Sequence, residues 1–160
     1  MKILYLLRHG KAVDGSCDFE RGLSPRGESD ARSMGRTLKE RGINPDIVYC
    51  SNAPRARQTA EIILPVTGIE TDKICFDDDL YLAPPNVLLE LIAGFDDNCE
   101  SALICGHNPG LELLASSYLK SNAEKFPTCA FREIRFNTES WAALGQDTVE
   151  ETTLITPKGQ

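Results

Sequence analysis

Short apolar runs alternate with helical patterns along this chain, and this alternation constrains the fold more than any other feature. Buried strands are predicted over residues 3–7, 46–50 and 102–105, and a short strand over 72–76. Helices are predicted from residue 25 to about residue 42, and over about 54–64, 86–94 and 109–119. This order is typical of an α/β protein, a three-layer α/β/α sandwich with a mostly parallel sheet.

The first predicted helix has the clearest boundaries. Ser24 is in place to cap it, Pro25 suits the first helical position, and Gly42 is a typical residue just past a helix end. Near the other end of the chain, "CAFREIRF" and "SWAAL" predict a hairpin that turns around 137–139, followed by a loose tail, "TPKGQ". Because no linker or repeat interrupts the pattern, residues 1–160 are expected to form a single domain.

Composition and charge exclude several classes of protein. The formal net charge is -7 and the basic residues form no cluster, which argues against nucleic-acid binding. No apolar run is long enough for a membrane span or a signal peptide, so a cytoplasmic protein without a membrane partner is expected. Six cysteines without a C-x-x-C pair, and two histidines, argue against a structural zinc site. We therefore expect no metal and no cofactor, and a monomer as the default for this size.

Unusual residues follow three of the predicted strands. Arg8 and His9 come directly after the first strand. Arg55 opens the helix after the second strand, and His107 follows the strand at 102–105. Because the carboxyl ends of parallel strands meet at one edge, where ligands bind, both histidines of the chain are predicted to lie together with two arginines.

Each of these residues also has a structural interpretation when it is considered by itself. A histidine after a strand can be a satisfied structural residue, and Arg55 can be a solvated helix residue. Their coincidence at one edge favours a site. Arginine binds phosphate oxygens as a fork, and a neutral histidine is a nucleophile at pH 7. The set therefore predicts a pocket for phosphoryl transfer, a reaction that depends on positioning and charge stabilisation.

The motifs that carry these residues resemble those of a known family. "LLRHGKA", "DFERGLSPRGESDA", "SNAPRARQTAE" and "ICGHNPG" occur in this order over about residues 3–119. They resemble the histidine phosphatase superfamily, which has the phosphoglycerate-mutase-like fold, and within it the short SixA-type phosphohistidine phosphatases. The resemblance implies that His9 is the nucleophile that becomes phosphorylated. It also implies a set of phosphate-binding residues: Arg8, Arg21, Arg55 and His107.

The resemblance further implies a reaction. The chain is expected to be a metal-independent phosphatase of signal transduction that hydrolyses phosphohistidine on proteins through an intermediate on His9. One alternative is a phosphatase or mutase for a small phosphorylated metabolite on the same fold. A second alternative, from a different class, is a non-catalytic phosphate-binding regulatory module. The partner would accordingly be a phosphorylated protein or a phosphometabolite.

The proton donor is the open part of this prediction. Larger members of the superfamily carry an acidic residue in an insertion that this chain is too short to hold. Asp18 is the first candidate, and its alternative interpretation is a solvated residue or an ion-pair partner of Arg21. Weaker candidates are Asp77, Asp78, Asp79 and Glu90. A site without a dedicated acid suits phosphohistidine, since the protonated form of that group releases neutral imidazole.

Overall fold

The computed structural model describes residues 1–119 and 125–157 of the chain. Its strands and helices lie in an alternating order. They are β1 (Lys2–Arg8), α1 (Pro25–Glu40), β2 (Ile47–Ser51), α2 (Pro54–Val66), η1 (Thr71–Lys73), β3 (Cys75–Asp77), η2 (Asp78–Leu80), α3 (Pro85–Ala93), β4 (Ser101–Gly106), α4 (Gly110–Tyr118), β5 (Phe131–Phe136), η3 (Trp141–Ala143), η4 (Gln146–Thr148) and β6 (Val149–Ile155), where η marks a short 3₁₀ helix.

One mixed sheet forms the middle layer of the molecule, with the strand order β3-β2-β4-β1-β5-β6. Strands β3, β2, β4 and β1 are parallel to one another. Strand β5 pairs antiparallel with β1, and β6 pairs antiparallel with β5. Of these strands, β5 is therefore antiparallel to the other five. The expectation of a mostly parallel sheet is confirmed.

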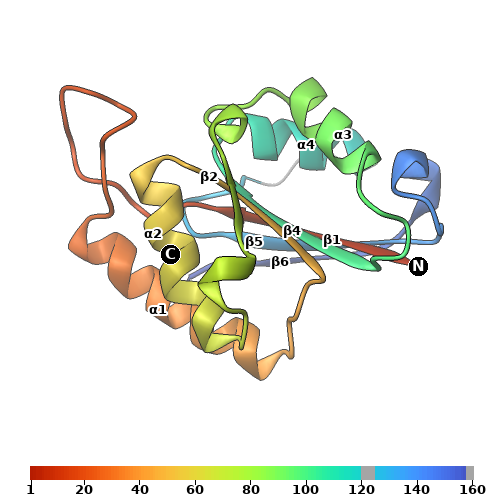
Figure 1. The fold of residues 1–160 in the computed structure, drawn as a ribbon, viewed down its shortest axis with the longest axis horizontal. Helices are drawn as coiled ribbons and strands as arrows, with labels where there is room; N and C mark the ends of the chain where they lie inside the picture. The colour runs from red at the N-terminus through yellow and green to blue at the C-terminus, as the bar shows by residue number, and fades with distance from the viewer. Residues whose placement is uncertain (120–124, 158–160) are drawn as a thin grey trace.

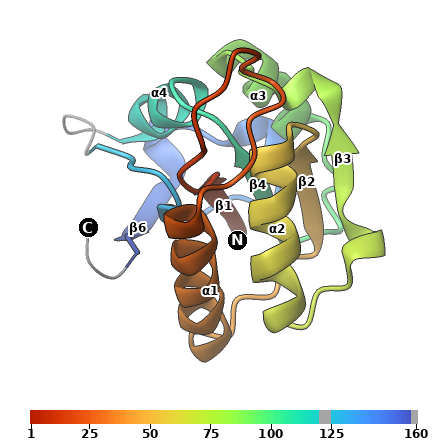
Figure 2. The same cartoon turned by 90° about the vertical axis from the view of Figure 1, so that its left-hand side faces the viewer.

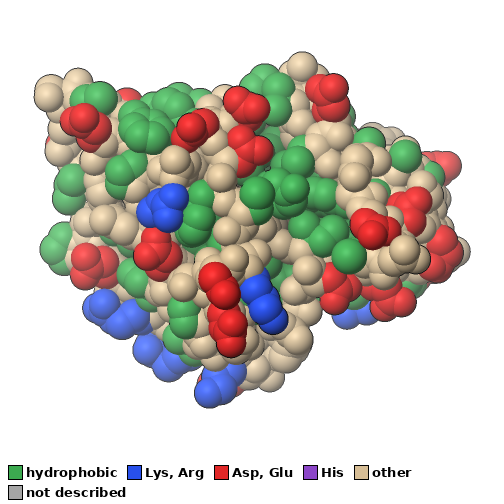
Figure 3. All heavy atoms as spheres, in the orientation of Figure 1, with side chains coloured by type: hydrophobic (Ala, Val, Ile, Leu, Met, Phe, Trp, Pro, Cys, Tyr) green, Lys and Arg blue, Asp and Glu red, His purple; other side chains and the backbone are tan. Residues whose placement is uncertain are grey.

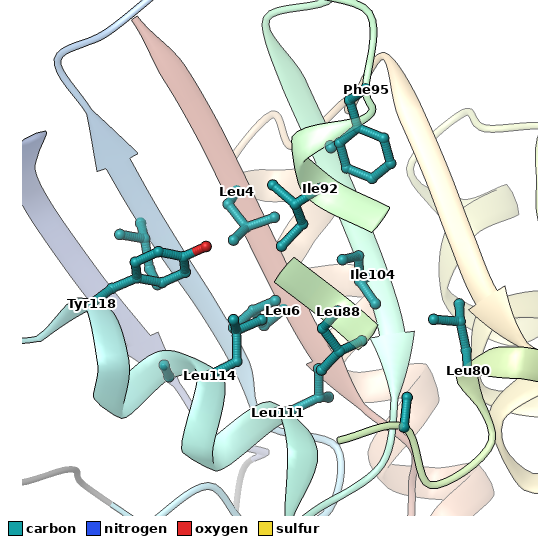
Figure 4. Packing of buried hydrophobic residues seen from close by; sticks show 14 of the residues in the cluster. Leu4, Leu6, Leu80, Leu88, Ile92, Phe95, Ile104, Leu111, Leu114 and Tyr118 are labelled. Carbon is teal, nitrogen blue, oxygen red and sulfur yellow. The ribbon is translucent and has the colours of Figure 1, made fainter. Parts of the chain in front are cut away.

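Helices cover both faces of this sheet (Figures 1 and 2). Side chains alternate along β1, so that Leu4 and Leu6 pack with α3 and α4, as Figure 4 shows. Tyr5 and Leu7 pack on the opposite face with α1 and α2. A strand covered on both faces needs apolar residues at every position, which explains the unbroken run at 3–7. The three-layer α/β/α sandwich is confirmed.

The boundaries of α1 agree with the sequence. The Ser24 hydroxyl accepts a hydrogen bond from the Gly27 backbone N–H at 3.0 Å, and Pro25 is the first helical residue. The helix ends at Glu40, and Gly42 follows with a φ of 70°. That left-handed conformation is favourable for glycine because it has no Cβ.

Two predicted strands were wrong in their position. The partner of β5 is β6, at Val149–Ile155, and not "SWAAL". Trp141 instead begins η3, is 1% exposed, and donates its indole N–H to the Cys99 carbonyl at 3.0 Å. Burial of this large side chain with its polar group satisfied outweighs the alternating pattern of the segment. The strand predicted at 72–76 begins only at Cys75, since Thr71–Lys73 forms η1.

The chain leaves the sheet after Ile155, where β6 ends. Thr156 and Pro157 lie beyond β6, and residues 158–160 of the predicted tail lie outside the described residues. On the face drawn in Figure 3, basic side chains gather mainly at the lower left, where Figure 1 places α1, while acidic ones are spread over the whole face. Across residues 1–119 and 125–157, no helix combines the length and the apolar character that a membrane span needs.

Candidate active site

The predicted site residues lie at the carboxyl edge of the sheet. In the register of the sheet, Arg8 at the end of β1 is opposite Gly106 at the end of β4, and the His9 backbone N–H donates to the Gly106 carbonyl at 3.1 Å. The loop that leaves β1 extends beyond this edge (Figures 1 and 2). A pocket of about 430 Å³ opens there and is lined by Arg8, His9, Lys11, Ala12, Asp14, Asp18, Arg21, Arg55, Leu82, Asn108 and Thr128.

His9 is held in one tautomer. Its Nδ1 lies 2.7 Å from the Gly10 carbonyl oxygen, which can only accept, so Nδ1 carries the proton. Its Nε2 is then unprotonated and accepts a hydrogen bond from Arg55 Nε at 3.4 Å. Burial, aided by the arginines nearby, lowers the pKa of His9 to about 4 against the opposing bond to Gly10. The ring is therefore neutral at pH 7, with a lone pair on Nε2 in the pocket.

Arg55 enters the pocket from the first turn of α2, where Pro54 begins the helix. The arginine is 3% exposed. Its Nη1 donates to the Asp18 backbone carbonyl at 2.7 Å, and its Nη2 lies 3.0 Å from the Asp18 carboxylate. Together with the bond to His9, these contacts use all three guanidinium nitrogens, although each Nη still carries a second hydrogen.

His107 lies beside His9, with the two ring centroids 5.0 Å apart. Its Nε2 is 2.7 Å from the Ser51 hydroxyl, while its buried Nδ1 has no partner in the described residues. Burial lowers the pKa of His107 to about 3, and the positive charges of the site add to this effect. Both histidines of the chain are thus neutral at pH 7. Their rings lie side by side at the edge where the strand order predicted them.

Arg8 and Asn108 share one acceptor. Arg8 Nη1 donates to the Phe126 carbonyl at 3.1 Å, and Asn108 Nδ2 donates to the same oxygen at 2.8 Å. Arg8 Nε and Asn108 Oδ1 are buried without a partner in the part of the chain that the structure describes. Unpaired buried polar atoms are costly in a folded protein, so such atoms beside a pocket indicate groups that a ligand completes.

Asp18 and Arg21 lie in the pocket as well, on the loop between β1 and α1. Arg21 Nη1 is 3.0 Å from the Asp18 carboxylate, so the alternative interpretation of an ion pair between them is confirmed. The hydroxyl of Tyr81 also donates to this carboxylate. The Tyr81 bond, with smaller contributions from the two arginines, lowers the pKa of Asp18 to about 2.

This environment does not favour Asp18 as a proton donor. The carboxyl is ionised at neutral pH and already accepts from Arg21, Arg55 and Tyr81. The weaker candidates do not replace it, because none of them lines the pocket. Those residues are Asp77, Asp78, Asp79 and Glu90.

Three supporting residues take a larger part in the site than their sequence indicated. Ser51 contacts His107, and the Thr59 hydroxyl accepts from the Gly10 N–H at 2.9 Å. Their place in the "SNAPRARQT" motif was the signal for this role. Tyr81, between η2 and α3, was missed because nothing in its local sequence marks it.

Within residues 1–119 and 125–157, no group of three or more His, Cys, Asp or Glu side chains could hold a metal ion. The charge at the pocket comes instead from side chains. Arg8, Arg21 and Arg55 all line it. Arginine is cationic at any physiological pH and matches phosphate oxygens as a fork. A neutral histidine beside such forks is equipped to accept a phosphoryl group.

Comparison with known proteins agrees with this chemistry. The family model "Histidine phosphatase superfamily (branch 1)" matches residues 4–80. An uncharacterised protein of Mycobacterium tuberculosis is 34% identical over 141 residues, which are 81% of this chain and 86% of that protein. The chain belongs to the histidine phosphatase superfamily.

Solved structures extend the match over the whole fold. A protein of Nakamurella multipartitia, provisionally described as phosphohistidine phosphatase SixA, has a TM-score of 0.84 and 26% identity, covering 99% of this chain and 97% of that one. A protein of Agrobacterium tumefaciens with the same provisional description has a TM-score of 0.78 and 28% identity, covering 84% of this chain and 92% of that one. The phosphoglycerate-mutase-like fold and the resemblance to SixA-type members are thereby confirmed.

Proposed function

We propose that this protein is a phosphatase that hydrolyses phosphohistidine on other proteins through a phosphohistidine intermediate on His9. The observation that carries this proposal is the state of His9. The ring is neutral, its Nδ1 is held by Gly10, and its Nε2 lies in an arginine-lined pocket. A fixed, unprotonated nitrogen is the form of histidine that attacks phosphorus.

In the first step, His9 Nε2 forms a bond to phosphorus as the bond from phosphorus to the leaving group breaks. Arg8, Arg55 and His107 bind the phosphoryl oxygens during this step, and Arg21 contributes from the loop. Each of these residues either lines the pocket or lies beside His9. Cations held in place before the reaction stabilise the transition state without having to reorganise.

In the second step, water attacks the phosphorus of phosphorylated His9. The P–N bond breaks, inorganic phosphate leaves, and the bonding electron pair returns to Nε2. The Gly10 carbonyl holds Nδ1–H throughout, so the leaving ring is a neutral imidazole. His9 thereby returns to the tautomer in which it began.

The protonation of the site favours a phosphoramidate substrate over an alkyl phosphate. An alkoxide leaving group needs a proton, yet at neutral pH Asp18 is ionised and His107 is a neutral imidazole, so neither is an effective acid. Phosphohistidine that is protonated on its ring leaves as neutral imidazole and needs no acid from the enzyme. This difference supports phosphohistidine as the substrate rather than a sugar phosphate.

The proposal is tested by trapping the intermediate. The purified protein is mixed with a radiolabelled phosphohistidine protein and quenched in alkali, in which phosphohistidine survives. We expect label on His9, and a loss of turnover on the order of 10⁴-fold or more in His9→Ala. A substrate panel then compares a phosphohistidine peptide with sugar phosphates. Full turnover by His9→Ala, or faster hydrolysis of the sugar phosphates, would contradict the proposal.

A further inference from the structure

Asp18 binds the far end of the Arg55 side chain through two of its oxygen atoms. Its backbone carbonyl accepts from Nη1 at 2.7 Å, and its carboxylate accepts from Nη2 at 3.0 Å. These two nitrogens form the far end of the guanidinium group. One loop residue therefore accepts hydrogen bonds from both Nη nitrogens, one through its main-chain oxygen and one through its side chain.

The other edge of the same guanidinium faces the nucleophile. Arg55 Nε lies 3.4 Å from His9 Nε2, which is longer than the common distance for an N–H hydrogen bond. Asp18 uses one hydrogen on each Nη nitrogen, so hydrogens remain on the edge that faces His9. With its far end held, Arg55 presents its Nε side to the atom that would receive the phosphoryl group.

Asp18 is itself fixed by groups that do not touch His9. Arg21 binds its carboxylate at 3.0 Å and donates its own Nε–H to the Val13 carbonyl at 2.7 Å. Tyr81 donates to the other carboxylate oxygen, and its ring lies edge-on to Phe19 with centroids 4.9 Å apart. The carboxylate is therefore held from three sides although its side chain is 48% exposed, whereas that of Arg55 is 4% exposed.

We propose that Asp18 is a positioning residue that aims the Nε edge of Arg55 at the phosphoryl group on His9. This inference rests on the proposed function and adds a role that differs from proton donation. Arginine has several freely rotating bonds, and a fork contributes fully to phosphoryl transfer only when it is aligned beforehand. In this way the loop after β1 influences the reaction by orienting an arginine that belongs to α2.

Two other roles for Asp18 make different predictions. A proton donor would matter most for poor leaving groups and little for a protonated phosphoramidate. A carboxylate that merely occupies the phosphate site would inhibit, so its removal would speed the reaction. A positioning residue matters equally for every leaving group, because the fork acts on the phosphoryl group itself.

The experiment is a double-mutant cycle of Asp18→Ala and Arg55→Ala, measured as the rate of His9 phosphorylation by a small phosphoramidate and by an aryl phosphate. We expect Asp18→Ala to slow both substrates by the same factor, about 10- to 100-fold. In the Arg55→Ala background the same change is expected to cost less than about 3-fold, since coupled residues are not additive. Asp18→Asn, which keeps an oxygen for Nη2, is expected to recover part of the rate.

Glu20→Gln is the matched control, because Glu20 is an exposed carboxylate on the same loop. It is expected to keep the wild-type rate, and thermal melting of every variant checks that the fold is intact. An equal loss from Asp18→Ala with and without Arg55 would overturn the inference, as would a loss confined to the aryl phosphate or a faster reaction. These outcomes leave the proposed function standing, because that function is tested separately, by the labelling of His9 in the wild-type protein and by the substrate panel.

Discussion

Strand β1 carries a cation at each end, and the two cations differ in how many of their hydrogen-bond donors the protein satisfies. Lys2 at the start of the strand is fully buried, and its Nζ donates to the carbonyls of Asp97 and Cys99 at 2.5 and 2.8 Å. The same Nζ lies 5.5 Å from the centroid of the Trp141 ring. Arg8 at the end of the strand donates through Nη1 to one carbonyl, and its buried Nε has no partner among the described residues.

This difference separates a structural cation from one that awaits a ligand. The fold itself supplies the acceptors of Lys2, so the charge stabilises the packing of the amino edge of the sheet. Arg8 keeps an unsatisfied donor beside a pocket, which is costly to the fold and useful to an anionic ligand. A buried cation whose hydrogen-bond acceptors all come from the protein has a structural role. A buried cation beside a cavity with a donor that has no acceptor is suited to bind a ligand.

Arg8→Met should show the largest effect and should separate activity from stability. We expect kcat/KM for a phosphohistidine substrate to fall on the order of 10²- to 10³-fold, because the transition state loses the stabilisation of one preorganised cation. The free energy of unfolding should change by less than about 1 kcal/mol, since methionine retains the packing of the stem. Steady-state kinetics and urea unfolding test the two parts, and a large loss of stability with normal activity would reverse the comparison.

A lower pH should destabilise the protein because of the two histidines at the edge of the sheet where the parallel strands end. The pKa values of His9 and His107 are about 4 and about 3 in the folded protein, against 6.5 for an ordinary histidine. Below pH 6.5 the unfolded chain binds protons that these rings do not, so the free energy of unfolding falls as the pH is lowered toward 4. Each histidine contributes at most about 1.4 kcal/mol per pH unit, or about 2 kcal/mol between pH 6.5 and 5.

Urea unfolding at several pH values measures this slope. His9→Asn and His107→Asn should each give a shallower dependence on pH than the wild-type protein between pH 6.5 and 5. A slope that is unchanged in both variants would mean that the two rings take up protons in the folded state as readily as in the unfolded chain.

Lys2→Met should show the smallest effect and the opposite pattern to Arg8→Met. The Cys99 carbonyl keeps the indole N–H of Trp141 as a donor at 3.0 Å, so the Asp97 carbonyl is the acceptor that loses most. We expect a destabilisation of about 2 kcal/mol, the cost of one unsatisfied buried group together with the lost contact to the ring. Activity per folded molecule should stay at the wild-type level, and a drop in kcat/KM without loss of stability would contradict the structural role.

Much of this architecture was predictable because its signals are local. An apolar run of five residues, a serine followed by proline, and a glycine after a helix each report a local preference. Parallel strands with helical connections bring their carboxyl ends to one edge, so the meeting of Arg8, His9, Arg55 and His107 followed from topology. The second strand of the hairpin was predicted in the wrong place because polar and apolar residues alternate in "SWAAL". The burial of Trp141 in this segment depends on Cys99, which accepts its indole N–H and lies 42 residues away in the chain.

Periodicity and motif order can be read along the chain, so they were enough to predict the layers of the fold, the edge that bears the site and the residues that meet there. The tautomer of His9, the ionisation of Asp18 and the inclusion of Tyr81 follow only from the folded structure. Those properties arise from burial and from contacts between distant segments, such as the bond from Tyr81 to Asp18 across 63 positions of the chain. Protonation depends on solvent exclusion and on neighbouring charges, and neither exists until the chain has folded.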